Sequence, residues 1–137
     1  MRAVSGCLIL LLVTSHMSVA RKFTKCQFLR ELRKGNVAKK DLATFLCIAQ
    51  HESGLNTAAR GGPNRDRSYD NGIFQINDRY WCKNRGVGGS CNINCAKLRD
   101  NNVADDIKCA LKIKKSQGFT AWVVYRKYCT RASLPSC

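Results

Sequence analysis

Residues 61–77, GGPNRDRSYDNGIFQIN, decide the fold class of this chain. Glycine, proline and asparagine at 61–64, and Asp-Asn-Gly at 70–72, mark turns around short polar stretches, and the apolar residues of 73–76 follow. This pattern predicts a small β-hairpin region. Helical patterns occur before and after it, and no other segment has a convincing strand pattern. We therefore expect an α+β fold in one compact domain.

The helical patterns are read from apolar residues that recur at three- and four-residue spacing. The expected helices are 26–34, 42–53, 104–115 and a short one at 121–128. For the second helix, Asp41 is the expected N-cap, and Ser53-Gly54 supplies the expected end.

The first twenty residues have the pattern of a secretory signal peptide. Arg2 precedes an apolar run from Cys7 to Val13, and the small residues of 18–20 suit a signal peptidase. A membrane anchor is the alternative, but a spanning helix needs about 20 apolar residues and this run is shorter. We therefore expect a signal peptide at 1–20 and a secreted, extracellular domain at 21–137.

The cysteine count points to disulfides. Nine cysteines become eight when Cys7 leaves with the signal peptide, and an even number in a short secreted chain is typical of a disulfide framework. Zinc is the alternative, suggested by the close pair Cys91 and Cys95. Since His51 is the only histidine after residue 20, a mixed cysteine–histidine site is disfavoured. We expect four bridges.

The chain is strongly basic, with 24 Lys and Arg against 9 Asp and Glu and a formal net charge of +15. Such a charge attracts polyanions, whether nucleic acid, acidic glycan or anionic lipid. The basic residues are scattered along the chain, and no zinc-finger, basic-zipper or RNA-recognition pattern is present. Nucleic acid is therefore not expected as the cognate partner.

Two carboxyl groups lie in contrasting surroundings. Glu52 follows Ala49 by three residues and Phe45 by seven, so its side chain leaves from the apolar face of the expected helix. Desolvation and the negative end of the helix dipole would both raise its pKa. Asp70 lies among polar neighbours and should stay ionised. An acid paired with an anion is the arrangement that cleaves glycosidic bonds, although 70–72 also fits a simple turn.

The segments AQHESGLNTAA (49–59) and SYDNGIFQINDRYWC (68–82) resemble the two catalytic stretches of c-type lysozymes. The resemblance extends over residues 21–137 and includes the CNINC motif, TAWVVYRKYC and all eight cysteines. It implies a mostly helical lobe, a small β lobe and a cleft between them. It also implies that Glu52 is the general acid and that Asp70 lies on a strand facing the cleft. Shorter spacings between several cysteines resemble an invertebrate member.

The resemblance further implies substrate-binding residues, with Trp122 packed against the acid. The substrate-binding set is Asn64, Gln75, Asn77, Tyr80, Trp81 and Trp122. Tyr80 and Tyr125 stand where many vertebrate members have tryptophan, and Gln117 falls near a position where some members have aspartate. The family order of disulfides implies the pairs Cys26–Cys137, Cys47–Cys129, Cys82–Cys95 and Cys91–Cys109.

The implied activity is hydrolysis of the β-1,4 bond between N-acetylmuramic acid and N-acetylglucosamine in bacterial peptidoglycan. It requires no cofactor, and we expect a monomer that serves antibacterial defence more than digestion, because its charge favours adsorption to acidic walls. Two alternatives stay open: a non-catalytic α-lactalbumin-like binding or regulatory protein, and a cationic membrane-active antimicrobial protein.

A structural Ca²⁺ ion is a further hypothesis. CAKLRDNNVADDIKC (95–109) resembles the calcium loop of α-lactalbumin. Its expected oxygen donors are the carboxylates of Asp100, Asp105 and Asp106 and the backbone carbonyls of Lys97 and Asn102. The alternative is that the two adjacent aspartates cap the following helix.

Overall fold

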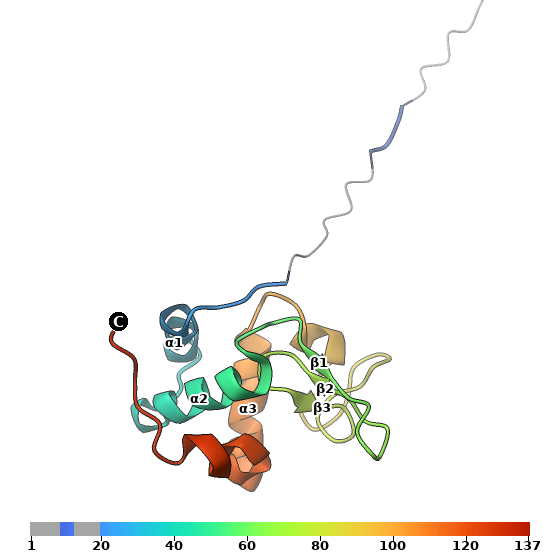
Figure 1. Cartoon of the computed structure of the whole chain (residues 1–137). Coiled ribbons are helices and arrows are strands. Elements are labelled where there is room, and N and C mark those ends of the chain that lie inside the picture. The colour runs from blue at the N-terminus through green and yellow to red at the C-terminus, as the bar shows by residue number, and fades with distance from the viewer. Residues whose placement is uncertain (1–8, 13–19) are drawn as a thin grey trace, which may run out of the picture.

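The computed structural model describes residues 9–12 and 20–137, and it places the helices on one side of the molecule and a small sheet on the other (Figure 1). The expected signal peptide lies mostly outside the described residues. The α-helices of the described part are α1 (Lys25–Lys34), α2 (Leu42–Ser53) and α3 (Ala104–Gln117). The strands β1 (Arg60–Gly61), β2 (Asp70–Asn71) and β3 (Ile76–Asn77) form one antiparallel sheet in that order. The α+β class is confirmed.

Short helical turns connect these elements. They are the 3₁₀ turns η1 (Lys39–Asp41), η2 (Cys95–Leu98) and η3 (Phe119–Ala121) and the π-helical turn η4 (Tyr125–Cys129). The short helix expected at 121–128 begins later than predicted, because Trp122 has an extended backbone, with φ −100° and ψ 119°, and the helical conformation follows it and runs to Cys129. The indole N–H of Trp122 donates to the carbonyl of Phe74 at 3.0 Å, which holds the ring in the interior.

Helix α2 begins and ends where the sequence predicts, with Asp41 at the N-cap position and Gly54 directly after the last residue, but Asp41 does not cap it with its side chain. Gly54 adopts the left-handed conformation at φ 62°, and its N–H bonds to carbonyls of the last helical turn. Asp41 makes no capping hydrogen bond; its carboxylate accepts one from Lys114 of α3 at 2.8 Å. The Asp41 carboxylate therefore links the start of α2 to α3. It binds the ammonium group of Lys114 in place of the free backbone N–H groups at the start of α2.

Four disulfides tie the chain together, as expected for this fold. They join Cys26 to Cys137, Cys47 to Cys129, Cys82 to Cys95 and Cys91 to Cys109, which are the pairs that the resemblance implies. The first two close the longest loops, with sequence separations of 111 and 82 residues, so they restrict the unfolded chain most.

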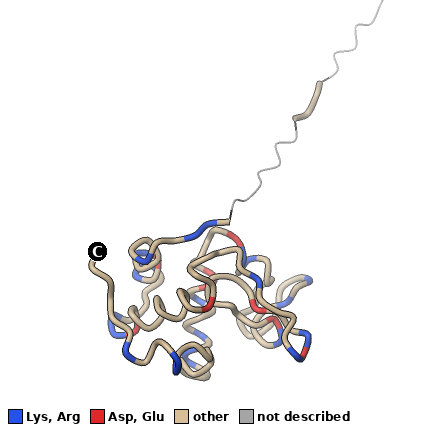
Figure 2. The backbone as a smooth tube through the Cα atoms, in the orientation of Figure 1, with Lys and Arg blue, Asp and Glu red and all other residues tan. Residues whose placement is uncertain are grey.

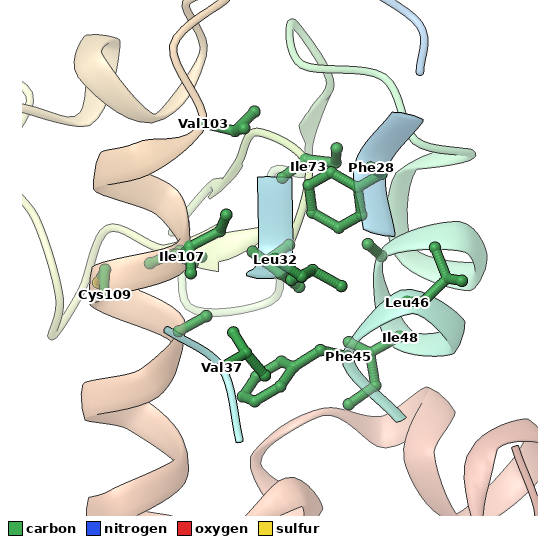
Figure 3. Close-up of a cluster of buried hydrophobic side chains, with 14 of the residues drawn as sticks. Phe28, Leu32, Val37, Phe45, Leu46, Ile48, Ile73, Val103, Ile107 and Cys109 are labelled. Carbon is green, nitrogen blue, oxygen red and sulfur yellow. The ribbon is translucent and has the colours of Figure 1, made fainter. Parts of the chain in front are cut away.

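The connection between β2 and β3 enters the core. The sequence predicts a small hairpin region here, and the structure adds that residues 71–74 of the β2–β3 turn are all buried. Figure 3 shows Ile73 beside Phe28, among apolar side chains that include Phe45 of α2 and Ile107 of α3. The ring of Phe74 is fully buried, with ring centroids 5.6 Å from Phe28 and 5.8 Å from Phe45. The sheet is therefore anchored to the helices through its own turn.

Gly72 gives a test of this anchor. It has φ +73°, and a Cβ at this position would collide with the backbone carbonyl of Leu98. Gly86 has the same φ, but a Cβ there would meet no atom within 4 Å. We predict that Gly72→Ala lowers the free energy of unfolding by roughly 2 to 4 kcal/mol, while Gly86→Ala costs about 1 kcal/mol from backbone strain alone. Chemical denaturation of the two variants measures the difference, and equal losses would contradict the anchor.

Candidate active site

A cleft lies between the sheet and the helices. It consists of two adjoining cavities of about 360 and 440 Å³ that share Asn77, Trp81, Gln117 and Ala121 on their walls. The first cavity also contains Glu52, Asp70, Gln75 and Trp122, and the second also contains Asn64 and Tyr80. The cleft thus brings together both expected catalytic residues and every expected substrate-binding residue.

Glu52 occupies the last turn of α2, where the left-handed Gly54 stops the helix. The hydroxyl of Ser53 lies 2.7 Å from the carbonyl of Ile73 and 3.1 Å from that of Ala49. Because one of these carbonyls belongs to the β2–β3 turn and the other to α2, Ser53 fixes the end of the helix against the sheet. The carboxyl of the neighbouring Glu52 is thereby held at the cleft.

The environment of Glu52 favours the protonated acid. Burial raises its pKa from an ordinary value of 4.5 to about 7, and the negative charge of Asp70 contributes in the same direction. Burial agrees with the sequence argument. The second cause differs from the sequence argument, which expected the negative end of the helix dipole to raise this pKa. In the structure the negative charge of Asp70, across the cleft, raises it.

Asp70 lies on β2, between Gly61 of β1 and Asn77 of β3. One of its carboxylate oxygens accepts a hydrogen bond from the side-chain amide of Asn64 at 3.0 Å, and the other accepts one from Asn77 at 2.9 Å. Two amide donors on two oxygens suit an ionised carboxylate, which accepts and does not donate. The cleft therefore contains one half-buried acid with a raised pKa and one carboxylate that accepts two amide hydrogen bonds.

The cleft also offers surfaces for a ligand. Tyr80 is 59% exposed, whereas the rings of Trp81 and Trp122 are largely buried and form the walls. The amide of Gln75 donates to the carbonyl of Gly72 at 3.0 Å, so it is fixed to its own turn. Gln117 of α3 lies on both cavities, where its uncharged side chain takes part in shaping the outer cleft.

The expected calcium loop does not gather its carboxylates. No group of three or more His, Cys, Asp and Glu side chains could hold a metal ion within residues 9–12 and 20–137. Asp106 is turned inward and is 1% exposed, whereas Asp100 accepts a local hydrogen bond from the backbone N–H of Asn102. Lys97 and Asp105 line a groove beside the Cys91–Cys109 disulfide, and neither Asp100 nor Asp106 lines that groove. The helix-capping alternative is not observed either, because the residue at the cap of α3 is Val103.

Sequence reasoning missed two polar residues behind Asp70. Ser68 accepts hydrogen bonds from Asn64 and Asn77, and it donates to Asp66 at 2.5 Å. The Asp-x-Ser spacing is a local signal, because Asp66 also accepts from the backbone N–H of Ser68 two residues on. The sequence alone gives no sign that this turn reaches the catalytic carboxylate.

Comparisons with known proteins agree with this fold and site. Residues 21–137 match the C-type lysozyme/alpha-lactalbumin family. Lysozyme P of Drosophila melanogaster is 42% identical over 92% of this chain and 90% of its own length, and Lysozyme c-1 of Anopheles gambiae is 35% identical over 99% and 96%. The crystal structure of lysozyme from Equus asinus superposes with a TM-score of 0.75 at 37% identity, covering 83% of this chain and 93% of that one.

The chain therefore belongs to the C-type lysozyme/alpha-lactalbumin family. Within it, the chain is similar to insect lysozymes and to a lysozyme from the shrimp Litopenaeus vannamei, at 36% identity and a TM-score of 0.75 over 84% of this chain and 92% of the other. It is a glycoside hydrolase of the lysozyme type, and the expected resemblance to an invertebrate member is confirmed.

The two causes of the raised Glu52 pKa can be separated by experiment. In Asp70→Asn the negative charge is lost and burial remains, so we predict that the pKa of Glu52 falls from about 7 but stays above 4.5. NMR titration of the glutamate carboxyl carbon measures both values. A pKa of Glu52 that is unchanged in the variant would mean that the two carboxyls do not interact.

Proposed function

We propose that this protein hydrolyses the β-1,4 bond between N-acetylmuramic acid and N-acetylglucosamine in bacterial peptidoglycan, with Glu52 as general acid and Asp70 as its anionic partner. The observation that carries the proposal is the half-buried carboxyl of Glu52, with a pKa of about 7, facing the hydrogen-bonded carboxylate of Asp70 in one cleft. This is the pairing of environments that glycosidic cleavage requires.

In this mechanism Glu52 donates its proton to the glycosidic oxygen while the bond from that oxygen to the sugar's anomeric carbon breaks. Positive charge develops at the anomeric carbon, and Asp70 stabilises or captures it. Water then adds at that carbon, and Glu52, now ionised, accepts the proton that the water gives up. Activity should decline as pH rises through about 7, because deprotonated Glu52 has no proton to transfer.

The walls of the cleft suit a polysaccharide. The aromatic rings of Tyr80 and Trp81 offer apolar faces for sugar rings. The side chains of Asn64, Gln75 and Asn77 also line the cleft, where acceptor positions that remain on their amide oxygens can bind hydroxyl and N-acetyl N–H groups. Trp122 and Glu52 line the same cavity, and we propose that the indole ring helps to desolvate the acid. These six residues form the proposed substrate-binding set.

The charge of the chain fits an acidic cell wall. Lys and Arg are spread over both the helical part and the sheet part, as Figure 2 shows. We propose a secreted, monomeric protein with a defence role. Once Arg2 leaves with the signal peptide it has 23 Lys and Arg against 9 Asp and Glu, and the field of this excess positive charge concentrates it on bacterial surfaces. In the described residues no helix is long and apolar enough to cross a membrane.

The catalytic assignment predicts that Glu52→Gln lowers the rate of cell-wall lysis by about 100-fold to 10,000-fold, because the amide keeps the shape but has no proton to transfer. Chitooligosaccharide affinity should persist. Glu31→Gln is the matched control, because Glu31 lies on α1, does not line either cavity of the cleft, and forms an ion pair with the exposed Lys34.

Asp70→Asn should also reduce lysis strongly, by removing the stabilising anion. If Glu52→Gln lysed walls at the rate of Glu31→Gln, the acid assignment would be wrong. Killing of bacteria by an inactive Glu52→Gln protein would instead support the cationic membrane-active alternative.

We also propose the loop 97–106 as a structural calcium site with no part in the chemistry. Support comes from one buried oxygen of Asp106 that lacks a hydrogen-bond partner, and from the charges of Asp100 and Asp105, which act on it. Burial, followed by these charges, raises the pKa of Asp106 well above its usual range. A hard cation would satisfy such a cluster, but the side chains would have to come together on binding.

If calcium binds here, the melting temperature of the calcium-loaded protein should fall when EDTA is added, because a ligand that binds only the folded state stabilises it. Asp106→Asn should lose this response, while the matched variant Asp78→Asn in the β lobe should retain it. An unchanged melting temperature on EDTA addition would remove the calcium site.

A further inference from the structure

We infer that Arg65 is a specificity-determining residue for the proposed reaction: its guanidinium pairs with a carboxylate on the peptide carried by muramic acid, and so favours peptidoglycan over uncharged chitin. Arg65 lines the outer cavity of the cleft, the one that also contains Asn64 and Tyr80. The inference rests on the proposed function, because it concerns which polysaccharide the same cleft selects.

The wall of the outer cavity has two charged side chains, Arg65 and Asp66, and their surroundings differ. One oxygen of Asp66 accepts a hydrogen bond from the guanidinium of Arg79 at 2.8 Å, and the other accepts one from the hydroxyl of Ser68. Arg65 is exposed and has no ion-pair partner among residues 20–137. The outer cavity therefore presents one unpaired positive charge to a ligand.

The neighbouring arginines of the β lobe are engaged or lie away from the cleft. The guanidinium of Arg60 lies over the ring of Tyr69, 3.9 Å from its centroid, and Arg79 is held in its ion pair. Arg67 is exposed but lines neither cavity. Within residues 60–79, Arg65 is therefore the arginine that combines an unpaired charge with a place on the cleft wall.

The inner cavity offers an anion no such attraction. Its charged side chains are the two carboxyls of Glu52 and Asp70, and an ionised Asp70 repels a carboxylate of the substrate. Gln117 of α3, which lies on the walls of both cavities, is uncharged. Repulsion in the inner cavity and attraction in the outer one therefore both favour an anionic substituent beside Arg65.

Peptidoglycan carries such anions and chitin does not. Chitin is a chain of N-acetylglucosamine without charge, whereas peptidoglycan alternates this sugar with N-acetylmuramic acid, whose lactyl group bears a peptide with free carboxylates. Because the two sugars alternate, a chain that fills both cavities brings a peptide-bearing sugar into or beside the outer one. A guanidinium matches a carboxylate with two parallel N–H donors, so Arg65 can form an ion pair that chitin cannot offer.

The exposure of Arg65 sets the size of the effect. An ion pair that is open to water is weak, and added salt weakens it further, so we expect the pair to change kcat/KM by about twofold to fivefold. The peptide lies away from the bond that is cleaved, so the ion pair is the same in the bound substrate and in the transition state. The change should therefore appear mainly in KM.

The test compares kcat/KM on two soluble substrates with equal numbers of sugars, a peptidoglycan fragment that keeps its peptides and a chitooligosaccharide. Arg65→Gln should lower the ratio of the two values, fragment over chitooligosaccharide, by about twofold to fivefold. Arg67→Gln is the matched control, because it removes the same charge from the same β1–β2 connection without touching the cleft wall. Arg67→Gln should keep the wild-type ratio.

Two further measurements identify the charge as the cause. Arg65→Glu should lower the ratio more than Arg65→Gln does, because it replaces attraction with repulsion. A fragment whose carboxylates have been converted to amides should remove the difference in ratio between the wild-type protein and Arg65→Gln.

Three results would overturn the inference. The first is the same ratio in the wild-type protein and in Arg65→Gln. The second is an equal fall in Arg65→Gln and Arg67→Gln, which would mean that only the net charge matters. The third is a fall for Arg65→Gln that persists with the amidated fragment, because the partner of Arg65 would then not be a carboxylate.

The wild-type protein and Glu52→Gln show which proposal has failed. If the wild-type protein cleaves the fragment, Glu52→Gln does not, and Arg65→Gln keeps the wild-type ratio, only the specificity role is wrong. If the wild-type protein cleaves neither substrate, the proposed function fails, and the role of Arg65 fails with it.

Discussion

The burial of Phe74 among the helices is the interaction on which the rest of the structure depends. Its ring packs against Phe28 and Phe45, and its carbonyl accepts the indole hydrogen bond of Trp122. A three-stranded sheet with two residues in each strand has little stability of its own, because such short ladders bury almost no apolar surface. The sheet persists because its turn is part of the helical core.

The same anchor creates the electrostatic contrast in the cleft. Phe74 and Ile73 bring the sheet against the end of α2, so Asp70 of the sheet faces Glu52 of the helix. Glu52 loses hydration on the helical side and its pKa rises to about 7, whereas Asp70 accepts amide hydrogen bonds from Asn77 of β3 and from Asn64 of the β1–β2 connection. Two identical functional groups thus acquire different surroundings from the layers that hold them.

The basic surface acts over longer distances than these contacts. Ion pairs within the described residues are few: Lys34–Glu31, Arg79–Asp66 and Lys114–Asp41. Most of the cations are therefore available to attract an acidic polymer, and that attraction weakens as salt is added, because screening shortens the range of the field. The charge brings the enzyme to its substrate, and the cleft performs the chemistry.

The sequence by itself determined the fold class, the helices α1, α2 and α3 within a few residues, and the choice of Glu52 and Asp70 as candidates. These features follow from local periodicity, from turn residues and from motif resemblance, all of which are written along the chain. Only the tertiary structure decided that residues 71–74 are buried, that the last helical segment begins after Trp122, and that Asp41 pairs with Lys114. It also decided that Ser68 bonds to the two amide side chains that hold Asp70. Each of these features depends on contacts between residues that are distant in the sequence or packed from several elements. No local sequence pattern specifies such contacts, because they form only when side chains are buried together and compete for hydrogen-bond partners in the assembled core.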